Sequence, residues 1–150
     1  MASFNKYNVF VENLAEKVHD LSLDSLRIAL ASGTGATGSW VTGLRDVGEI
    51  NEGNGYILSG KAVTVVSSLQ TGGFYKLTLN SPTTPWTGGP SPMTGFRYAV
   101  LYNDTPTGNP MPGAPKPLIG YWDYGTSVVL NSGETFTVTL DGVNGTLTIQ

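Results

Sequence analysis

The sequence of 150 residues lacks cysteine and contains one histidine, His19. Without cysteine the chain cannot form disulfide bonds or a zinc site with thiolate ligands. A histidine metal cluster or a catalytic triad built on His19 alone would need unusual partners, so no metal, cofactor or catalytic site is predicted. The first 20 residues also lack a basic leader before an unbroken apolar run, which argues against a signal peptide or a membrane span and favours synthesis in a cytoplasm.

Charge is also scarce, because Asp, Glu, Lys and Arg make up 13% of the chain, about half of their usual share. The net charge of -3 has the wrong sign for binding a phosphate backbone, so nucleic acid is not an expected partner. Two interpretations of the low charge stay open. The protein is either β-rich with many turns, or it uses much of its surface for contacts with neighbouring molecules, where charge is disfavoured.

Alternation of apolar and polar residues predicts half-buried antiparallel strands over most of the second half of the chain. In three of these runs the apolar residues are predicted to share one face: Phe96, Tyr98, Val100 and Tyr102; Leu118, Trp122 and Tyr124; and Phe136, Val138 and Leu140. The turn sequence DGVNG precedes TLTIQ at the end of the chain. We therefore expect the strand that contains Phe136, Val138 and Leu140 to form a C-terminal hairpin with TLTIQ.

The first half is expected to begin with one amphipathic helix at about residues 5–20. Its apolar stripe consists of Tyr7, Phe10, Val11, Leu14, Val18 and Leu21. A strand follows in SLRIALAS, and residues 33–60 are predicted to be mostly loop with one helical turn at about residues 45–50. KAVTVVSSLQ and FYKLTLN flank Thr71-Gly72-Gly73, which predicts a hairpin whose first strand is apolar enough to be buried on both faces.

These elements predict a mainly β fold. We expect a single domain spanning residues 1–150, built as an antiparallel β-sandwich or flattened barrel of seven or eight strands. The N-terminal amphipathic helix is expected to pack on a face or an edge of the sheet.

Two proline-rich stretches, residues 81–95 and 104–117, can form neither a helix nor a central strand. Irregular loops of this length in a compact domain are usually functional or disordered, so both are candidates for contacts with other molecules. The candidate contact residues in them are Pro85, Trp86, Pro90, Met93, Pro110, Met111 and Pro112. For Trp86 two alternatives stay open, which are burial against a partner and packing on its own domain.

Several motifs that could carry chemistry have simpler interpretations. Residues 33–38 match GxGxxG, but no uninterrupted helix and no βαβ pattern follow, which argues against a dinucleotide site. Asp123, Glu134 and Asp141 could supply a carboxylate pair, yet their positions in a strand and in turns favour solvated or turn roles. His19 is interpreted as a polar residue that complements the helix dipole.

Aromatic side chains offer one more possibility. An aromatic platform for a sugar or another protein could be formed by Trp40, Trp86, Tyr121, Trp122 and Tyr124. The alternation of its strand favours a core position for Trp122.

Several segments resemble a family of small structural proteins of tailed bacteriophages: FNKYNVFVENLAEKVHDL, DSLRIALAS, EINEGNGY, TGGFYKLTL, FRYAVLYND, LIGYWDYG and SGETFTVTLDGVNGTLTI. The resemblance covers nearly the whole chain except the two proline-rich loops and residues 33–43. It implies a virion protein that is synthesised in the host cytoplasm and is not an enzyme.

Within such a family, the favoured function is that of a capsid decoration or cement protein on the capsid exterior. Its expected partners are the major capsid protein and further copies of itself, with a trimer favoured because three-fold positions of an icosahedral shell present equivalent neighbours. No cofactor, nucleic acid or membrane is expected. A tail or receptor-binding component is the alternative, and a carbohydrate-binding module is less favoured.

Overall fold

The computed structural model describes residues 2–33, 36–106 and 116–150. It is mainly β, with 42% strand and 8% helix, which confirms the predicted fold class. The elements are, in chain order, β1 (Phe4–Lys6), α1 (Asn8–Ala15), β2 (Leu26–Ala31), the 3-10 helix η1 (Leu44–Asp46), β3 (Lys61–Thr71), β4 (Phe74–Asn80), β5 (Trp86–Thr87), β6 (Phe96–Asn103), β7 (Leu118–Val128), β8 (Thr135–Phe136) and β9 (Leu147–Ile149). No helix in these ranges is long and apolar enough to cross a membrane.

Seven strands form a nearly closed antiparallel sheet in the order β1-β7-β6-β2-β3-β4-β9, and β5 and β8 form a separate ribbon. The predicted C-terminal hairpin is wrong, because β8 pairs with β5 and β9 pairs with β4. The Asp141 carboxylate accepts hydrogen bonds from the backbone N–H groups of Val143 and Asn144, which forms a tight turn. The Thr146 N–H then donates to the Leu77 carbonyl and starts the pairing with β4.

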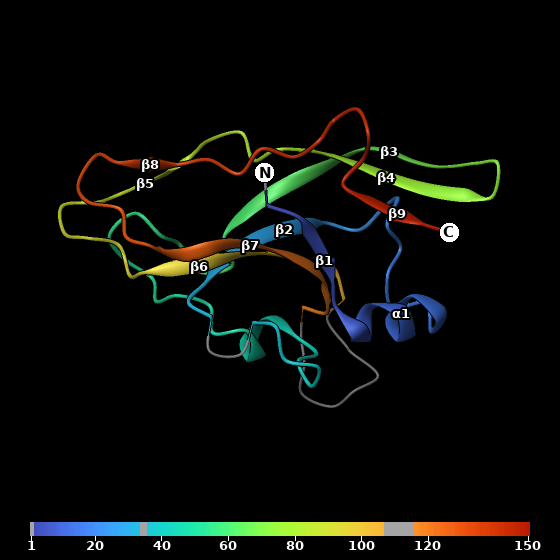
Figure 1. The fold of residues 1–150 in the computed structure, drawn as a ribbon, viewed down its shortest axis with the longest axis horizontal. Helices are drawn as coiled ribbons and strands as arrows, with labels where there is room; N and C mark the ends of the chain where they lie inside the picture. The colour runs from blue at the N-terminus through green and yellow to red at the C-terminus, as the bar shows by residue number, and fades with distance from the viewer. Residues whose placement is uncertain (1, 34–35, 107–115) are drawn as a thin grey trace.

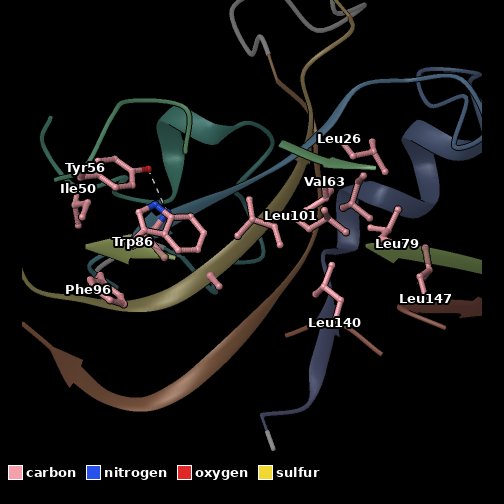
Figure 2. Close-up of a cluster of buried hydrophobic side chains, with 14 of the residues drawn as sticks. Leu26, Ile50, Tyr56, Val63, Leu79, Trp86, Phe96, Leu101, Leu140 and Leu147 are labelled. Carbon is pink, nitrogen blue, oxygen red and sulfur yellow. Dashed lines mark hydrogen bonds between the residues drawn. The ribbon is translucent and has the colours of Figure 1, made fainter. Parts of the chain in front are cut away.

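The sheet separates two hydrophobic cores, so its central strands β2 and β6 are buried on both faces. The larger core lies between β2, β6, β3, β4, β9 and the β5–β8 ribbon (Figure 2), and includes Leu26, Ile28, Leu77, Leu79, Leu101 and Leu147. The smaller core lies between the other face of β2 and β6 and the loop that carries η1, and includes Ala29, Ala31, Val41, Leu44, Val47 and Val100.

Register shifts explain why two of the predicted strand faces are wrong. The pairing of β6 with β7 shifts between Phe96 and Tyr98, so Phe96 joins the larger core while Tyr98 joins the smaller one. A second shift in the β6–β7 pairing separates Leu118, in the smaller core, from Trp122, which packs against the larger core. From the pair Tyr98–Asp123 to the pair Phe96–Val128, β7 advances five residues while β6 advances two, and at the second shift β7 has one extra residue. Extra residues on one strand change which residues face each side.

Helix α1 is shorter than the predicted range of about residues 5–20. Its start is delayed because residues 4–6 pair with β7 as strand β1, with Phe4 opposite Trp122. Its end is a Schellman motif, in which Lys17 adopts a left-handed φ of 61° and the Val18 N–H donates to the Asn13 carbonyl. This position usually holds glycine, so the sequence contains no local signal for the end of the helix.

The hairpin of β3 and β4 is confirmed. Gly72 and Gly73 have φ of 61° and 90°, and they connect the paired residues Thr71 and Phe74. Positive φ at both positions is typical of the two-residue turn that matches the twist of antiparallel strands. Burial of the first strand on both faces is wrong, since β3 is mostly exposed or half-buried.

Candidate interaction surfaces

Trp86 and Met93 lie inside the protein's own core. Trp86 is 2% exposed and lies among the residues of the larger core (Figure 2). Its ring packs against Phe136 with centroids 6.3 Å apart, and the Lys61 ammonium lies 5.6 Å from it. Met93 is 1% exposed, and its N–H donates to the Leu130 carbonyl at 2.9 Å. The prediction that these two side chains contact a partner is therefore wrong, and of the two alternatives for Trp86 the structure selects packing on its own domain.

Close backbone contacts hold residues 86–93 against the fold. The Gly88 N–H donates to the Glu134 carbonyl at 2.8 Å, and the Gly89 N–H donates to the Asn54 carbonyl at 2.9 Å. A Cβ atom at either glycine would collide with the backbone of Asn131 or Asn54. Glycine at positions 88 and 89 thus allows the chain to approach Asn54 and Asn131 closely enough to bury Trp86. The proline-rich composition of the loop does not predict this approach.

The other predicted contact residues have different positions. Pro85 and Pro90 are exposed on either side of the buried β5 segment, so a contact through them stays a prediction. Pro110, Met111 and Pro112 lie outside the described residues.

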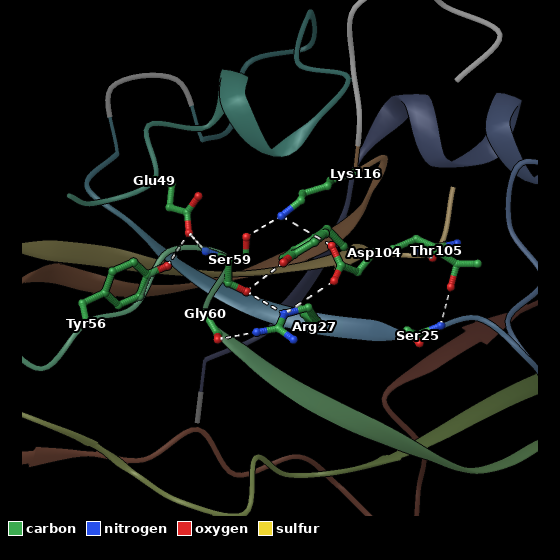
Figure 3. A network of polar contacts seen from close by, with 11 residues as sticks. Ser25, Arg27, Glu49, Tyr56, Ser59, Gly60, Asp104, Thr105 and Lys116 are labelled. Carbon is green, nitrogen blue, oxygen red and sulfur yellow. Dashed lines mark hydrogen bonds and ion pairs between the residues drawn. The ribbon is translucent and has the colours of Figure 1, made fainter. Parts of the chain in front are cut away.

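A polar network joins the two described ends of the second proline-rich loop to the sheet (Figure 3). Asp104 lies 3.4 Å from the Lys116 ammonium and 3.9 Å from the Arg27 guanidinium. Arg27 also donates to the carbonyls of Ser59 and Gly60 at 2.9 and 2.8 Å. These half-buried charges tie residues on either side of the loop to β2 and to the turn before β3.

Two more contacts stabilise the same region. The Tyr56 hydroxyl donates to the Glu49 carboxylate at 2.7 Å, and the Ser59 N–H donates to the same carboxylate at 2.6 Å. Burial, together with Glu49, raises the pKa of Tyr56 well above its usual value, so this hydroxyl stays a donor. The network is fully engaged in internal contacts, which indicates a structural role.

Three of the eleven exposed large apolar side chains in the described residues lie on the β3–β4 hairpin, which projects at one end of the molecule (Figure 1). We call Val66, Leu69 and Phe74 the hairpin surface; their side chains are 55%, 65% and 53% exposed. No residue from 62 to 75 is charged. The sequence predicts a strand buried on both faces at this position and therefore does not predict an exposed surface. The segment between Lys61 and Lys76 carries no charge, but residues 28–44 and 77–96 form longer uncharged stretches, so lack of charge alone does not identify this surface.

An aromatic cleft of about 380 Å³ opens between β1 and residues 137–141. Phe4 and Trp122 form one aromatic pair in it, with centroids 5.0 Å apart, and Tyr124 and Phe136 form another at 5.8 Å. Of the aromatic residues proposed as a platform, only Trp122 and Tyr124 meet in this cleft. Tyr121 packs against the smaller core, Trp86 is in the larger core, and Trp40 is exposed on a loop.

The ionisable side chains considered for catalysis have structural contacts. Asp123 forms a bidentate ion pair with Arg97 at 2.7 and 2.8 Å, and hydrogen bonds from Arg97 lower the pKa of its carboxyl. Glu134 accepts hydrogen bonds from the N–H and the side chain of Asn131, while Asp141 closes the turn before β9. Turn roles are confirmed for Glu134 and Asp141. Within the described ranges, no three His, Asp or Glu residues group as metal ligands.

His19 is buried, so its interpretation as a helix-end residue that complements the dipole is wrong. Its ring contacts Phe10 with centroids 5.3 Å apart, and its Nδ1 lies 3.2 Å from the Asn103 amide nitrogen. The helix ends before His19, and the following turn carries this side chain into the fold. Burial lowers the pKa of His19 to about 4, against the opposing effect of Asp24.

Comparisons of the chain with protein-family models, with curated proteins and with solved structures find no match.

Proposed function

We propose that the protein is a structural component of a bacteriophage virion and acts as a capsid decoration protein on the outside of the shell. The observation that carries the proposal is the hairpin surface, which presents three apolar side chains on a projecting β-hairpin with no charged residue from 62 to 75. An apolar patch on the surface of a monomeric protein often marks a binding site for a partner, and the central parts of interfaces are poor in charged residues. The resemblance of the chain to small phage structural proteins supports the same function.

In this proposal the major capsid protein is the partner, and each copy contacts two or more shell subunits. Copies that also contact one another make the later contacts effectively intramolecular, so weak single contacts add up to stable binding. Binding to the assembled shell but not to free subunits stabilises the shell by mass action. A trimer suits three-fold positions of the shell, and no cofactor takes part.

The decisive experiment is to determine the position and copy number of the protein in purified virions by image reconstruction. We expect repeated copies on the head exterior. Density for the protein only in the tail, or as isolated copies inside the head, would overturn the placement.

A pair of matched variants tests whether the hairpin surface makes the contact. Phe74→Ser removes an exposed apolar side chain from the hairpin surface, while Val143→Ser makes a similar change at an exposed turn outside it. We expect Phe74→Ser to reduce co-sedimentation with shells by about tenfold or more, as for an interface hot spot, and Val143→Ser to bind like the unchanged protein. Equal binding by both variants would contradict the role of the hairpin.

The aromatic cleft favours a second candidate function, which is recognition of a carbohydrate by a tail or receptor-binding component. Trp122 and Tyr124 lie close to the Arg97–Asp123 ion pair, and the cleft also contains the hydroxyl-bearing side chains of Thr137 and Thr139. Aromatic faces beside polar groups suit the apolar faces and hydroxyls of a sugar. Addition of bacterial surface glycans should then change tryptophan fluorescence in the unchanged protein and not in Trp122→Ala.

A further inference from the structure

Strand β3 has a free edge. It pairs with β4 along most of its length, but it pairs with β2 only from Lys61 to Val63. Within residues 2–33, 36–106 and 116–150, no backbone hydrogen bond reaches the other edge of β3 from residue 65 to residue 71. A register shift between Val65 and Ser67 limits the regular part of this free edge to residues 67–71. Such an edge is a template for pairing with another strand.

The turn determines which backbone groups face the free edge. In a two-residue hairpin the pair that flanks the turn, here Thr71 and Phe74, is hydrogen-bonded. Hydrogen-bonded and non-hydrogen-bonded pairs alternate along an antiparallel ladder. Leu69 therefore directs its N–H and C=O groups toward β4, whereas Ser68 and Gln70 direct theirs toward the free edge.

The pairing of β4 with β9 agrees with this assignment. Tyr75 and Leu77 lie opposite Gln70 and Ser68, and they pair with Ile149 and Leu147 of β9 on the far side of β4. The N–H and C=O groups of Tyr75 and Leu77 thus point toward β9 and away from β3. Those of Ser68 and Gln70 correspondingly point away from β4, toward the free edge.

The free edge has little protection against another strand. Proteins commonly protect an open edge with lysine, other charges or proline, and residues 62–75 contain none of these. The register shift near Val66 twists the start of the edge but leaves residues 67–71 regular. Leu69, at the centre of this stretch, is 65% exposed.

We propose that two copies of the protein pair through their β3 edges, antiparallel to each other, about a two-fold axis at Leu69. This register places Ser68 of each copy opposite Gln70 of the other. The outward N–H and C=O groups of these four residues, two from each copy, then all form hydrogen bonds between the copies. Leu69 of one copy lies beside Leu69 of its partner, so each covers apolar surface of the other. Because residues 62–71 of β3 are uncharged, a symmetric contact along residues 67–71 brings no like charges of this strand together.

The pairing can be tested on the free protein without shells, although Leu69 also belongs to the hairpin surface of the proposed function. The pairing is also compatible with a trimer, since two-fold axes of an icosahedral shell lie between neighbouring three-fold positions, where β3 edges would join one trimer to the next.

A single-cysteine experiment tests the register directly, because the chain has no other thiol. Leu69→Cys places two thiols at a close non-hydrogen-bonded pair on the two-fold axis, whereas Val143→Cys places an exposed thiol far from β3 in sequence. Under mild oxidation we expect Leu69→Cys to form a disulfide-linked dimer in non-reducing electrophoresis, at concentrations where Val143→Cys stays largely unlinked. No linkage in Leu69→Cys, or equal linkage in both variants, would overturn the register.

A charge variant tests the association itself. Leu69→Lys places two ammonium groups opposite each other at the axis, and Val143→Lys introduces the same charge at a site that is 79% exposed. In sedimentation velocity we expect the unchanged protein and Val143→Lys to associate into even numbers of copies as concentration rises, and Leu69→Lys to lose that step. Each variant is first compared by circular dichroism with the unchanged protein. A monomer or a trimer with no further association, or association unchanged in Leu69→Lys, would refute the proposal.

Shell binding by the unchanged protein is measured in parallel. Failure of the unchanged protein to bind shells, with the even-numbered association present, would count against the capsid function and leave the β3 pairing intact, so the two failures can be distinguished.

Discussion

At the scale of single residues, His19 is held in an environment that opposes its charge. The side chain is 6% exposed, and Nε2 has no hydrogen-bond partner among the described residues. Protonation of this imidazole inside the fold would place a positive charge beside Phe10 with little solvation. The folded protein therefore keeps His19 neutral where the unfolded chain protonates it.

This environment predicts a pH dependence of stability. The pKa of His19 is about 4 in the folded protein and near 6.5 in the unfolded chain, so only the unfolded chain takes up a proton between these values. We expect the free energy of unfolding to fall by about 2 to 3 kcal/mol as pH drops from 6.5 to 4. Denaturant unfolding across this range should show a flatter profile for His19→Gln, and an equally steep profile would exclude His19 as the cause.

Because Trp86 is buried, its mutation is expected to lower the stability of the free protein rather than to weaken binding to a partner. Trp86→Ala removes a large side chain from the larger core, so we expect it to lower the free energy of unfolding by about 3 to 5 kcal/mol. Pro85→Ala, at the exposed neighbour, should change it by no more than about 0.5 kcal/mol. Chemical denaturation of both variants measures the difference, and an unchanged midpoint in Trp86→Ala would contradict the core position.

At the scale of elements, α1 packs through few residues. Phe10 is buried against the larger core, whereas Val11 on the same helix is 52% exposed. Phe10→Ala should therefore cost about 3 to 5 kcal/mol of stability, and Val11→Ala should cost less than about 0.5 kcal/mol. Thermal unfolding of the free protein distinguishes the two, and loss of association without loss of stability in Phe10→Ala would place the helix in an interface instead.

At the scale of the whole molecule, the scarcity of charge on the hairpin surface predicts how shell binding responds to salt. Exposed charges are screened within about 10 Å at 0.1 M ionic strength, whereas apolar contacts are not weakened in this way. We expect the affinity for shells to change less than about threefold between 0.05 and 0.5 M sodium chloride, a range over which charge-driven complexes lose much more affinity. A steep loss in co-sedimentation over that range would assign binding to charged groups rather than to Val66, Leu69 and Phe74.

The candidate contact surface could be predicted from the sequence only in part. The low charge pointed to a surface used for contacts, but residues 62–75, where Val66, Leu69 and Phe74 are exposed, form a shorter uncharged stretch than residues 28–44 or 77–96. The proline-rich loops drew attention instead, because irregular segments often carry function. Burial of Trp86 depends on the approach of Asn54 and Asn131 from other parts of the chain, and no local pattern reports that approach.

By itself the sequence determined the mainly β content, the presence of one N-terminal helix and the Gly72-Gly73 hairpin, because alternation, helical spacing and turn chemistry act between near neighbours. Only the tertiary structure decided that β9 pairs with β4 and β8 with β5, and that bulges move Phe96 and Trp122 to the larger core. Strand partners and burial depend on the free energy of contacts between residues far apart in the chain. The same local pattern is compatible with several such arrangements, and packing of the whole molecule selects among them.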